Sequence, residues 1–519
     1  MALNSIKYLL FLALSAAVHA VLPQRYRNIF LLLASVYFCA CSGPVMLLVP
    51  LAVALISFFG AKWLAKPVYS RRLRRIRRRT PDGPRGEVVA VDTEKVKQTR
   101  LMLLVGALVL CLCFFKYAGI WSTFLTEPVT ILLPLGISFY TFSIIGYLID
   151  IYHSKMQPEK DLIAWLLSIF FFPQFSSGPI ARMRQLLPQL HEREITIAKT
   201  TEGLRRILMG AMAKVAVADG LAVLVNAFYG DMMAHTGLAT LLAVFLYPLQ
   251  IYFDFMGYSS MAIGSALLFG VRLQENFTAP FFAVSLSEIW KRWHMSLTGW
   301  FQDYIFTPLV WSRWWDKLVH PKDWQSRRPH MLMNLTIVFL LSGIWHGSTF
   351  NYAFWGLLMA LGRIAEETVP FLKRKRKTPT AVILGRIGTF FWWSFTHIFF
   401  RLTTLADVKL LAASICRPVS VSSFIPDLLN TAANDVAYSG TYFLIYFGCI
   451  AMGMLLQLWF DLRLDRSLRT KGAAPCTDVL ATFSPKLRWA LYWLMGFITA
   501  AMYLITQTSA SPSFIYAGY

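Results

Sequence analysis

The sequence is poor in charged residues. Only 15% of its 519 residues are Asp, Glu, Lys or Arg, whereas soluble domains average about 25%. Hydrophobic residues make up 56% of the chain, and several apolar runs are long enough to cross a bilayer. The composition therefore excludes an ordinary soluble domain and indicates a membrane protein.

Among the charged residues, the acidic ones are the scarcer. Asp and Glu total 27 against 50 Lys and Arg, which gives a formal net charge of +23. The cations gather in a few loops between apolar segments, at 66–100, 373–377 and 463–488. Lys and Arg are retained on the cytoplasmic side of membrane proteins. We therefore expect cytoplasmic loops and contacts with anionic lipids, and not a nucleic-acid partner.

Cofactor and metal motifs are also missing. The seven cysteines show neither metal-ligand spacing nor a secreted disulfide framework, and the two Cys-x-Cys pairs lie in apolar runs. The sequence contains no nucleophile elbow, phosphate-binding loop, HExxH zinc motif or dinucleotide fingerprint. We expect no metal and no permanently bound cofactor.

The apolar segments predict an all-α polytopic membrane protein with about 11–12 transmembrane helices, plus re-entrant and interfacial helices. We expect one membrane domain over 1–519, with N-terminal spans in 1–125, a core in 130–402 and C-terminal spans in 403–519. Twelve crossings would place both termini outside the cytoplasm. The segments are 5–22, 28–43, 45–65, 101–117, 128–150, 201–228, 236–265, 331–346, 350–369, 380–402, 440–460 and 487–507.

Two segments are not typical of simple transmembrane helices. The stretch 160–176 runs into "FFPQFSSGPIARMRQLLPQL", whose prolines and glycine predict a broken or re-entrant helix. The stretch 286–304 places its large apolar residues three and four positions apart, which predicts one interfacial helix with an apolar stripe. Ser285 or Ser287 is expected to cap its start.

Two histidines stand out among the nine. His346 lies in "LLSGIWHGSTF", inside the run 331–362 that contains no Asp, Glu, Lys or Arg. Ionisable side chains at membrane depth are costly and are candidates for function. His294 borders the apolar stripe of 286–304. A structural hydrogen bond is the alternative for each of them, and for His397 we expect such a bond to a backbone carbonyl.

A pair of neutral imidazoles suits acyl transfer, because one can take a proton from an attacking hydroxyl and one can return a proton to the leaving group. Asp219 and Asp254 lie in apolar runs, where each is expected to pair with a cation or to orient an imidazole. A transporter with a histidine in its proton path is the alternative outside enzymology.

Three motifs then point to a family: "QIYFDFMGYSSMAIG", "ENFTAPFFAVSLSEIWKRWHMSLTGWFQDYIFTPL" and "NLTIVFLLSGIWHGSTFNYAFWG". Together they closely resemble the membrane-bound O-acyltransferase (MBOAT) family, in the bacterial branch that serves polysaccharide O-acetylation and teichoic-acid D-alanylation. The similarity runs in order from about residue 130 to the end. The chain departs from the branch at Ser260, where an Asp is usual, and at Gln302, where an Arg is usual.

The resemblance implies a helical bundle around a central funnel, with His346 as the invariant histidine and His294 as the second one. An acyl thioester, either acetyl-CoA or an acyl-carrier protein, would enter from the cytoplasm. The acetyl group would pass to hydroxyls of a cell-surface polysaccharide, or to a partner protein outside the cytoplasm, at the bacterial cell membrane. D-Alanyl transfer from a carrier protein is the alternative. Residues expected to shape the site or bind the donor are Trp345, Asn334, Arg292, Trp293, Asp303 and Asp254.

Overall fold

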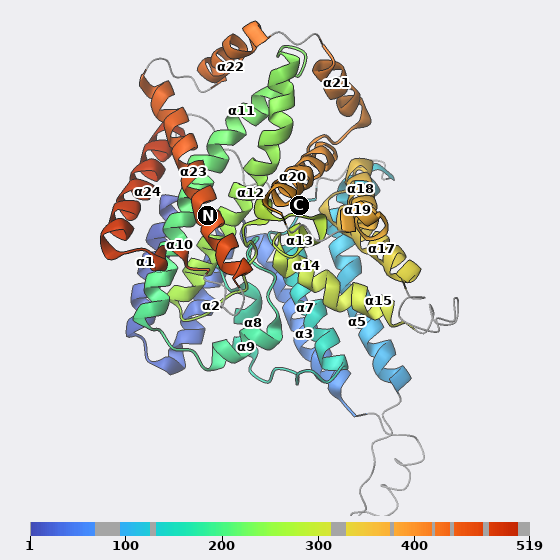
Figure 1. Ribbon diagram of the computed structural model, residues 1–519. Helices are drawn as coiled ribbons and strands as arrows, with labels where there is room; N and C mark the ends of the chain where they lie inside the picture. Colours follow the sequence, from blue (N-terminus) through green and yellow to red (C-terminus); the bar gives the residue numbers. More distant parts are fainter. Residues whose placement is uncertain are drawn as a thin grey trace, which may run out of the picture. The chain divides into compact units, whose positions relative to one another are not determined.

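The structure is a computed structural model that describes residues 2–67, 94–124, 131–312, 328–373, 378–417, 421–435, 441–470 and 477–506. Every regular element in these ranges is a helix (Figure 1). Six helices are long and apolar enough to cross a membrane. The predicted all-α fold of a multi-pass membrane protein is confirmed, and each of the twelve predicted segments contains a helix. The number of crossings stays a prediction.

The described chain forms two compact units. The smaller unit comprises 17–176 and 180–193, and the larger unit comprises 1–16, 177–179 and the chain from 194 onward. Helix α1 (Ile6–Val21) bridges the boundary at residue 16. The other helices of the smaller unit are α2 (Gln24–Ala40), η1 (Pro44–Leu47), α3 (Leu48–Ala65), α5 (Glu94–Lys116), α6 (Ala118–Trp121), η2 (Ser122–Phe124), α7 (Ile137–Tyr152), α8 (Leu162–Phe170) and α9 (Met183–His191).

The larger unit holds both candidate histidines. Its helices, in chain order, are α10 (Ile197–Ala211), the π-helix η3 (Met212–Ala218), α11 (Asp219–Gly230), α12 (Gly237–Leu268), η4 (Pro280–Phe282), α13 (Leu286–Trp290), α14 (Met295–Phe301), the π-helix η5 (Gln302–Phe306), α15 (Thr307–Val310), α17 (Arg328–His346), α18 (Phe350–Thr368), α19 (Pro370–Lys373), α20 (Pro379–Arg401), α21 (Leu405–Ile415), α22 (Val421–Asp435), α23 (Thr441–Arg469), η6 (Val479–Thr482) and α24 (Pro485–Thr506).

In the smaller unit, the predicted break after 160–176 is present. Helix α8 ends at Phe170 and α9 begins only at Met183. The intervening turn packs against Gly136, which has a φ of 72° and whose added Cβ would lie 2.0 Å from the carbonyl oxygen of Phe175. Only glycine fits a position with that φ and that close approach. Whether the broken segment re-enters the membrane stays a prediction.

Helices α10 and α12 form the closest pair in the larger unit because glycines face each other at two levels. A Cβ on Gly210 would lie 2.5 Å from the carbonyl oxygen of Gly257, and a Cβ on Gly203 would lie 2.7 Å from that of Gly264. Small residues at such contacts let two backbones approach closely, which is the usual way for helices to pack inside membranes.

The prediction of one continuous helix over 286–304 is wrong. The helix stops at Trp290, and His294 adopts a left-handed backbone with a φ of 43° before α14 begins. The cause is a competing set of hydrogen bonds: the Arg292 carbonyl accepts from the Thr278 amide, and the Met295 amide donates to the Asn276 carbonyl, both at 3.0 Å. The predicted cap is present, since Ser285 Oγ accepts from the Glu288 amide at 3.1 Å.

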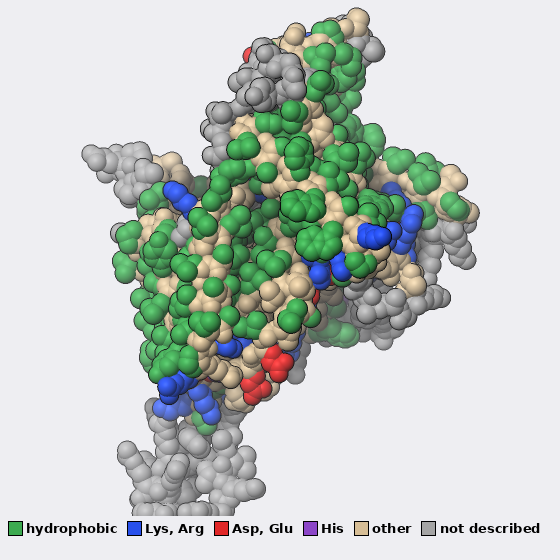
Figure 2. Space-filling model, turned by 90° about the vertical axis from the view of Figure 1, so that its left-hand side faces the viewer, with side chains coloured by type: hydrophobic (Ala, Val, Ile, Leu, Met, Phe, Trp, Pro, Cys, Tyr) green, Lys and Arg blue, Asp and Glu red, His purple; other side chains and the backbone are tan. Residues whose placement is uncertain are grey.

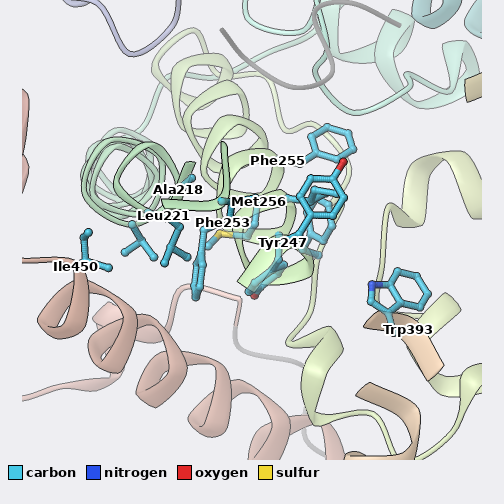
Figure 3. Close-up of a cluster of buried hydrophobic side chains, with 14 of the residues drawn as sticks. Ala218, Leu221, Tyr247, Phe253, Phe255, Met256, Trp393 and Ile450 are labelled. Carbon is cyan, nitrogen blue, oxygen red and sulfur yellow. The ribbon is translucent and has the colours of Figure 1, made fainter. Parts of the chain in front are cut away.

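The core of the larger unit is built around α12. Figure 3 shows Tyr247, Phe253 and Phe255 extending from this helix, with Leu221 of α11 and Ile450 of α23 beside them. All of these side chains are buried. The apolar stripe of 286–304 also joins the interior: five of its six residues, Leu286, Trp293, Leu297, Trp300 and Tyr304, are no more than 8% exposed. Its predicted position at a membrane interface stays a prediction.

Large hydrophobic side chains also cover the outside of the larger unit. On α24, Trp489, Trp493 and Phe497 are 61%, 76% and 69% exposed and recur every fourth residue. The space-filling view shows a broad hydrophobic surface with charged side chains gathered toward its edges (Figure 2). Contiguous exposed apolar surface of this kind marks contact with a membrane or a partner.

Candidate active site

His346 is the last residue of α17 and is held in an aromatic pocket. It is 4% exposed, and its ring centre lies 4.6 Å from Trp345, 4.9 Å from Phe400 and 5.3 Å from Trp355. The last two contacts are edge-on, the favourable arrangement for neighbouring rings. The imidazole therefore has a defined orientation within protein.

Glycines on both sides of His346 fix its backbone. A Cβ on Gly343 would lie 2.3 Å from the carbonyl oxygen of Tyr352, and a Cβ on Gly347 would lie 2.2 Å from the Tyr352 ring. Helix α18, which contains Tyr352, thus packs directly against the backbone that carries His346. Any larger residue at either glycine would force the two helices apart.

His294 is positioned by the segment before α13. Asn276 Oδ1 accepts from the amide and the hydroxyl of Ser296, at 3.2 and 2.6 Å, and Asn276 Nδ2 donates to Ser259 at 3.1 Å. The edge-on ring of Phe255 lies 4.6 Å from the imidazole. The structure thus assigns a supporting role to Asn276, which sequence reasoning missed although it lies within the quoted motif "ENFTAP".

Burial alone sets the protonation state of His294. The residue is 2% exposed, and it lies outside the helices long and apolar enough to cross a membrane. Loss of solvent around the imidazole lowers its pKa to about 3, because burial disfavours the charged form. The ring is therefore neutral at physiological pH and can act as a proton acceptor or as a hydrogen-bond donor.

Trp345 brings the two histidines together. Its ring centre lies 6.5 Å from that of His294 and 4.6 Å from that of His346, and the indole is 6% exposed. Two buried imidazoles thus share one aromatic neighbour in the interior of a membrane protein. Of the predicted site residues, the structure groups these three with Trp293, which is adjacent to His294 and packs 5.1 Å from Phe277.

Comparison with known proteins identifies the family of the chain. The membrane-bound O-acyltransferase family, MBOAT, matches residues 160–406. A probable alginate O-acetylase of Pseudomonas aeruginosa is 34% identical over 360 residues, which are 67% of this chain and 62% of that protein. The chain belongs to the MBOAT family.

More distant relatives carry related activities in their names. A peptidoglycan O-acetyltransferase of Helicobacter pylori is 29% identical over 60% of this chain and 64% of its own length. A teichoic acid D-alanyltransferase of Bacillus subtilis is 30% identical over 44% of this chain and 57% of its own length. The match thus covers somewhat less than two thirds of each of these MBOAT relatives.

Not every predicted site residue of this MBOAT protein lies beside the histidines. Asn334 is fully buried but precedes His346 by about three helical turns on α17, or about 18 Å along the helix. Asp303 is exposed on the π-helical turn η5. Roles for these two residues in binding stay predictions.

Arg292 is committed to an ion-pair network. Its guanidinium contacts Glu288 at 2.5 Å and Asp465 at 2.8 Å, and it donates to the Ala279 carbonyl at 3.2 Å. Asp465, buried on α23, also pairs with Arg386 at 2.8 Å. Donor binding by Arg292 stays a prediction, and an anionic donor would have to compete with these carboxylates.

The expectation that Asp219 and Asp254 pair with a cation is confirmed. Lys214 lies 2.6 Å from Asp219 and 2.7 Å from Asp254, and all three side chains are at most 6% exposed. Lys214 sits in the π-helix η3. Sequence reasoning missed it, although a lysine within an apolar run was the available signal. A substrate-binding role for Asp254 stays a prediction.

The hydrogen bond predicted for His397 is also confirmed, since its Nδ1 lies 2.7 Å from the Trp393 carbonyl oxygen. Across the described residues, no group of three or more His, Cys, Asp or Glu side chains is placed to hold a metal ion.

Proposed function

We propose that the chain is a membrane-embedded O-acyltransferase that moves an acetyl group from a cytoplasmic thioester to a hydroxyl outside the cytoplasm. The donor is acetyl-CoA or an acyl-carrier thioester. The acceptor is a cell-surface polysaccharide, or a partner protein in that pathway, and the chain works in the bacterial cell membrane with both termini outside the cytoplasm. The observation that carries the proposal is the approach of His294 and His346 to the same neighbour, Trp345.

In the proposed reaction one proton moves twice, first from the acceptor hydroxyl to a histidine and then to the departing thiolate. His346 removes the proton of the acceptor hydroxyl while the hydroxyl oxygen attacks the thioester carbonyl, and the carbon–sulfur bond breaks as the ester forms. His294 then relays this proton from the His346 imidazolium to the departing thiolate or, as a neutral hydrogen-bond donor, orients the thioester carbonyl. Proton transfer by a positioned histidine contributes about 10²–10⁴-fold to a rate. The acetyl-transferring relatives and the glycine-fixed backbone at His346 both support this assignment.

Mass analysis of surface glycans from cells with and without the chain tests the proposal. We expect hydroxyl-linked acetyl groups that depend on the chain and that disappear with His346→Gln or His294→Gln. The exposed His153 provides a control, and His153→Gln should keep wild-type acetylation. A chain-dependent D-alanyl group would replace the acetyl assignment, and full acetylation by properly inserted His346→Gln protein would refute the histidine mechanism.

A further inference from the structure

A second candidate site lies beside the two histidines. A cavity of about 320 Å³ is enclosed by the turn after α13, by α14 and η5, and by α17. This volume is within the range of about 300–1,000 Å³ that is typical of small-molecule pockets. Neither His294 nor His346 is among the described residues that line it, so the cavity is distinct from the pocket around the two histidines.

The walls of the cavity are apolar. Leu297 and Phe301 of α14 face Leu335, Val338 and Phe339 of α17 across it. The uncharged polar side chains that line it are Ser287, Thr298, Gln302 and Ser342. A ligand with many amide groups would find few hydrogen-bond partners in this cavity. Each buried polar group left without a partner would cost about 1–3 kcal/mol of binding free energy. The walls favour a hydrocarbon chain.

The lining combines buried residues with exposed ones. Phe339 and Ser342 are buried, whereas Lys291 and Gln302 are exposed. Arg363 also contributes to the lining from α18 but is ion-paired with Glu366 and Glu367. A ligand that fits therefore has an apolar tail at the buried end and a polar head at the exposed end.

Lys291 determines the sign of that head group. It is exposed, and its ammonium has no ion pair or hydrogen bond with the part of the chain that the structure describes. Its ammonium is a point charge with three donors, well suited to a phosphate. An anionic head group would complement it, and the membrane itself supplies amphiphiles of this chemistry.

We propose that this cavity binds one acyl chain of an anionic membrane phospholipid, with the phosphate beside Lys291 and the chain end toward Phe339 and Ser342. The inference does not depend on the proposed function. Its structural consequence is direct, because α14 begins immediately after His294 and α17 ends at His346. A bound chain fills the space between the helices that carry the two candidate histidines.

Photolabelling in lipid nanodiscs tests this. The full chain is reconstituted with phosphatidylglycerol whose acyl chain carries a diazirine, irradiated, and mapped by peptide mass spectrometry. We expect labels on 297–306 and 331–342, at least five-fold weaker when the same probe carries the zwitterionic phosphatidylethanolamine head group. Lys291→Glu should remove this preference.

Cavity-filling variants supply the matched comparison. Val338→Trp places an indole in the cavity and should reduce the labelling of both segments at least five-fold. Met333→Trp adds the same group at a position on α17 that is 43% exposed and outside the lining, and should leave labelling unchanged. Leu297→Trp tests the opposite wall if Val338→Trp does not fold.

Three results would overturn the proposal. The first is equal labelling in Val338→Trp and Met333→Trp. The second is labelling confined to outward-facing residues of α17 such as Leu341 and Ile344, which would indicate bulk lipid. The third is displacement of the label by acetyl-CoA but not by unlabelled phosphatidylglycerol, which would assign the cavity to a thioester donor instead.

Discussion

The indole of Trp345 and the imidazole of His294 lie 6.5 Å apart, centre to centre, although they belong to different helical segments. Trp345 also contacts its neighbour His346, so its indole lies near both candidate catalytic rings. Small errors in the position of reacting groups are expensive, and a displacement of about 1 Å can cost about 10²-fold in rate.

We therefore expect Trp345→Ala to reduce kcat for acetyl transfer by about 10²-fold and Trp345→Phe to retain most of it. Reconstituted vesicles with a radiolabelled donor would measure both. Trp489→Ala, at an exposed position on α24, is the matched control and should behave as wild type. Equal kcat for Trp345→Ala and Trp489→Ala would show that Trp345 has no positioning role.

The buried His294 predicts a pH-dependent stability. Burial lowers the pKa of His294 to about 3, while the unfolded chain has an ordinary histidine pKa of about 6.5. As the pH falls below about 6.5, the His294 imidazole binds a proton in the unfolded state but stays unprotonated in the folded state. His294 thus makes its full contribution to the free energy of unfolding above about pH 6.5. This contribution falls by about 1.4 kcal/mol per pH unit as the pH decreases toward 3.

Thermal unfolding between pH 7.5 and pH 5 would measure the effect. The midpoint for the wild type should fall on acidification, and His294→Gln should fall less because the variant has no imidazole to protonate. His153→Gln, at an exposed position, should reproduce the wild-type slope. Parallel slopes for the wild type and His294→Gln would contradict a buried neutral imidazole.

Lys214 holds two carboxylates together. Lys214→Met leaves Asp219 and Asp254 buried without their shared cation, and breaking a buried pair in this way costs about 3–5 kcal/mol. We expect a large drop in the unfolding midpoint. The triple variant Lys214→Met, Asp219→Asn, Asp254→Asn should recover part of it because no net charge is left. Lys291→Met, at an exposed position, should change the midpoint little.

The glycine contact between α10 and α12 gives a prediction about packing. Gly257→Ala would place a Cβ 2.7 Å from the Gly210 carbonyl oxygen, and overpacking of this kind costs about 1–3 kcal/mol. Gly448→Ala on α23 is the matched control, since its added Cβ would meet no atom within 4 Å. An unfolding midpoint for Gly257→Ala no lower than that for Gly448→Ala would show that the helices can separate freely.

Local features of this fold were predictable from the sequence. The apolar lengths predicted where helices lie, and Ser285 was predictable as a cap because capping depends on residues within one turn. The break between α13 and α14 was not predictable in that way. It depends on Asn276 and Thr278, whose backbone groups replace the helical hydrogen bonds of the 286–304 segment.

The same distinction between local and long-range features applies to the candidate site. His346 and His294 were identifiable by unusual surroundings in the sequence, and their common neighbour Trp345 was predicted with them. Lys214 was identifiable as a lysine within an apolar run, but its pairing with Asp254 on α12 was not. Asp465 was not identifiable as a partner of Arg292, because the two residues lie on elements that periodicity does not place together. Asn334 lies on the same helix as His346. A shared helix does not bring Asn334 close to a residue that lies about three turns away.

The contact between Tyr352 and the glycines at 343 and 347 has a consequence for redesign. A Cβ at Gly343 would lie 2.3 Å from the Tyr352 carbonyl oxygen and a Cβ at Gly347 would lie 2.2 Å from the Tyr352 ring, so α17 and α18 hold the backbone at His346 as one unit. The hairpin of α17 and α18 is therefore the part of the chain to transfer intact into a chimeric acyltransferase, with Gly343, Gly347 and Tyr352 kept together.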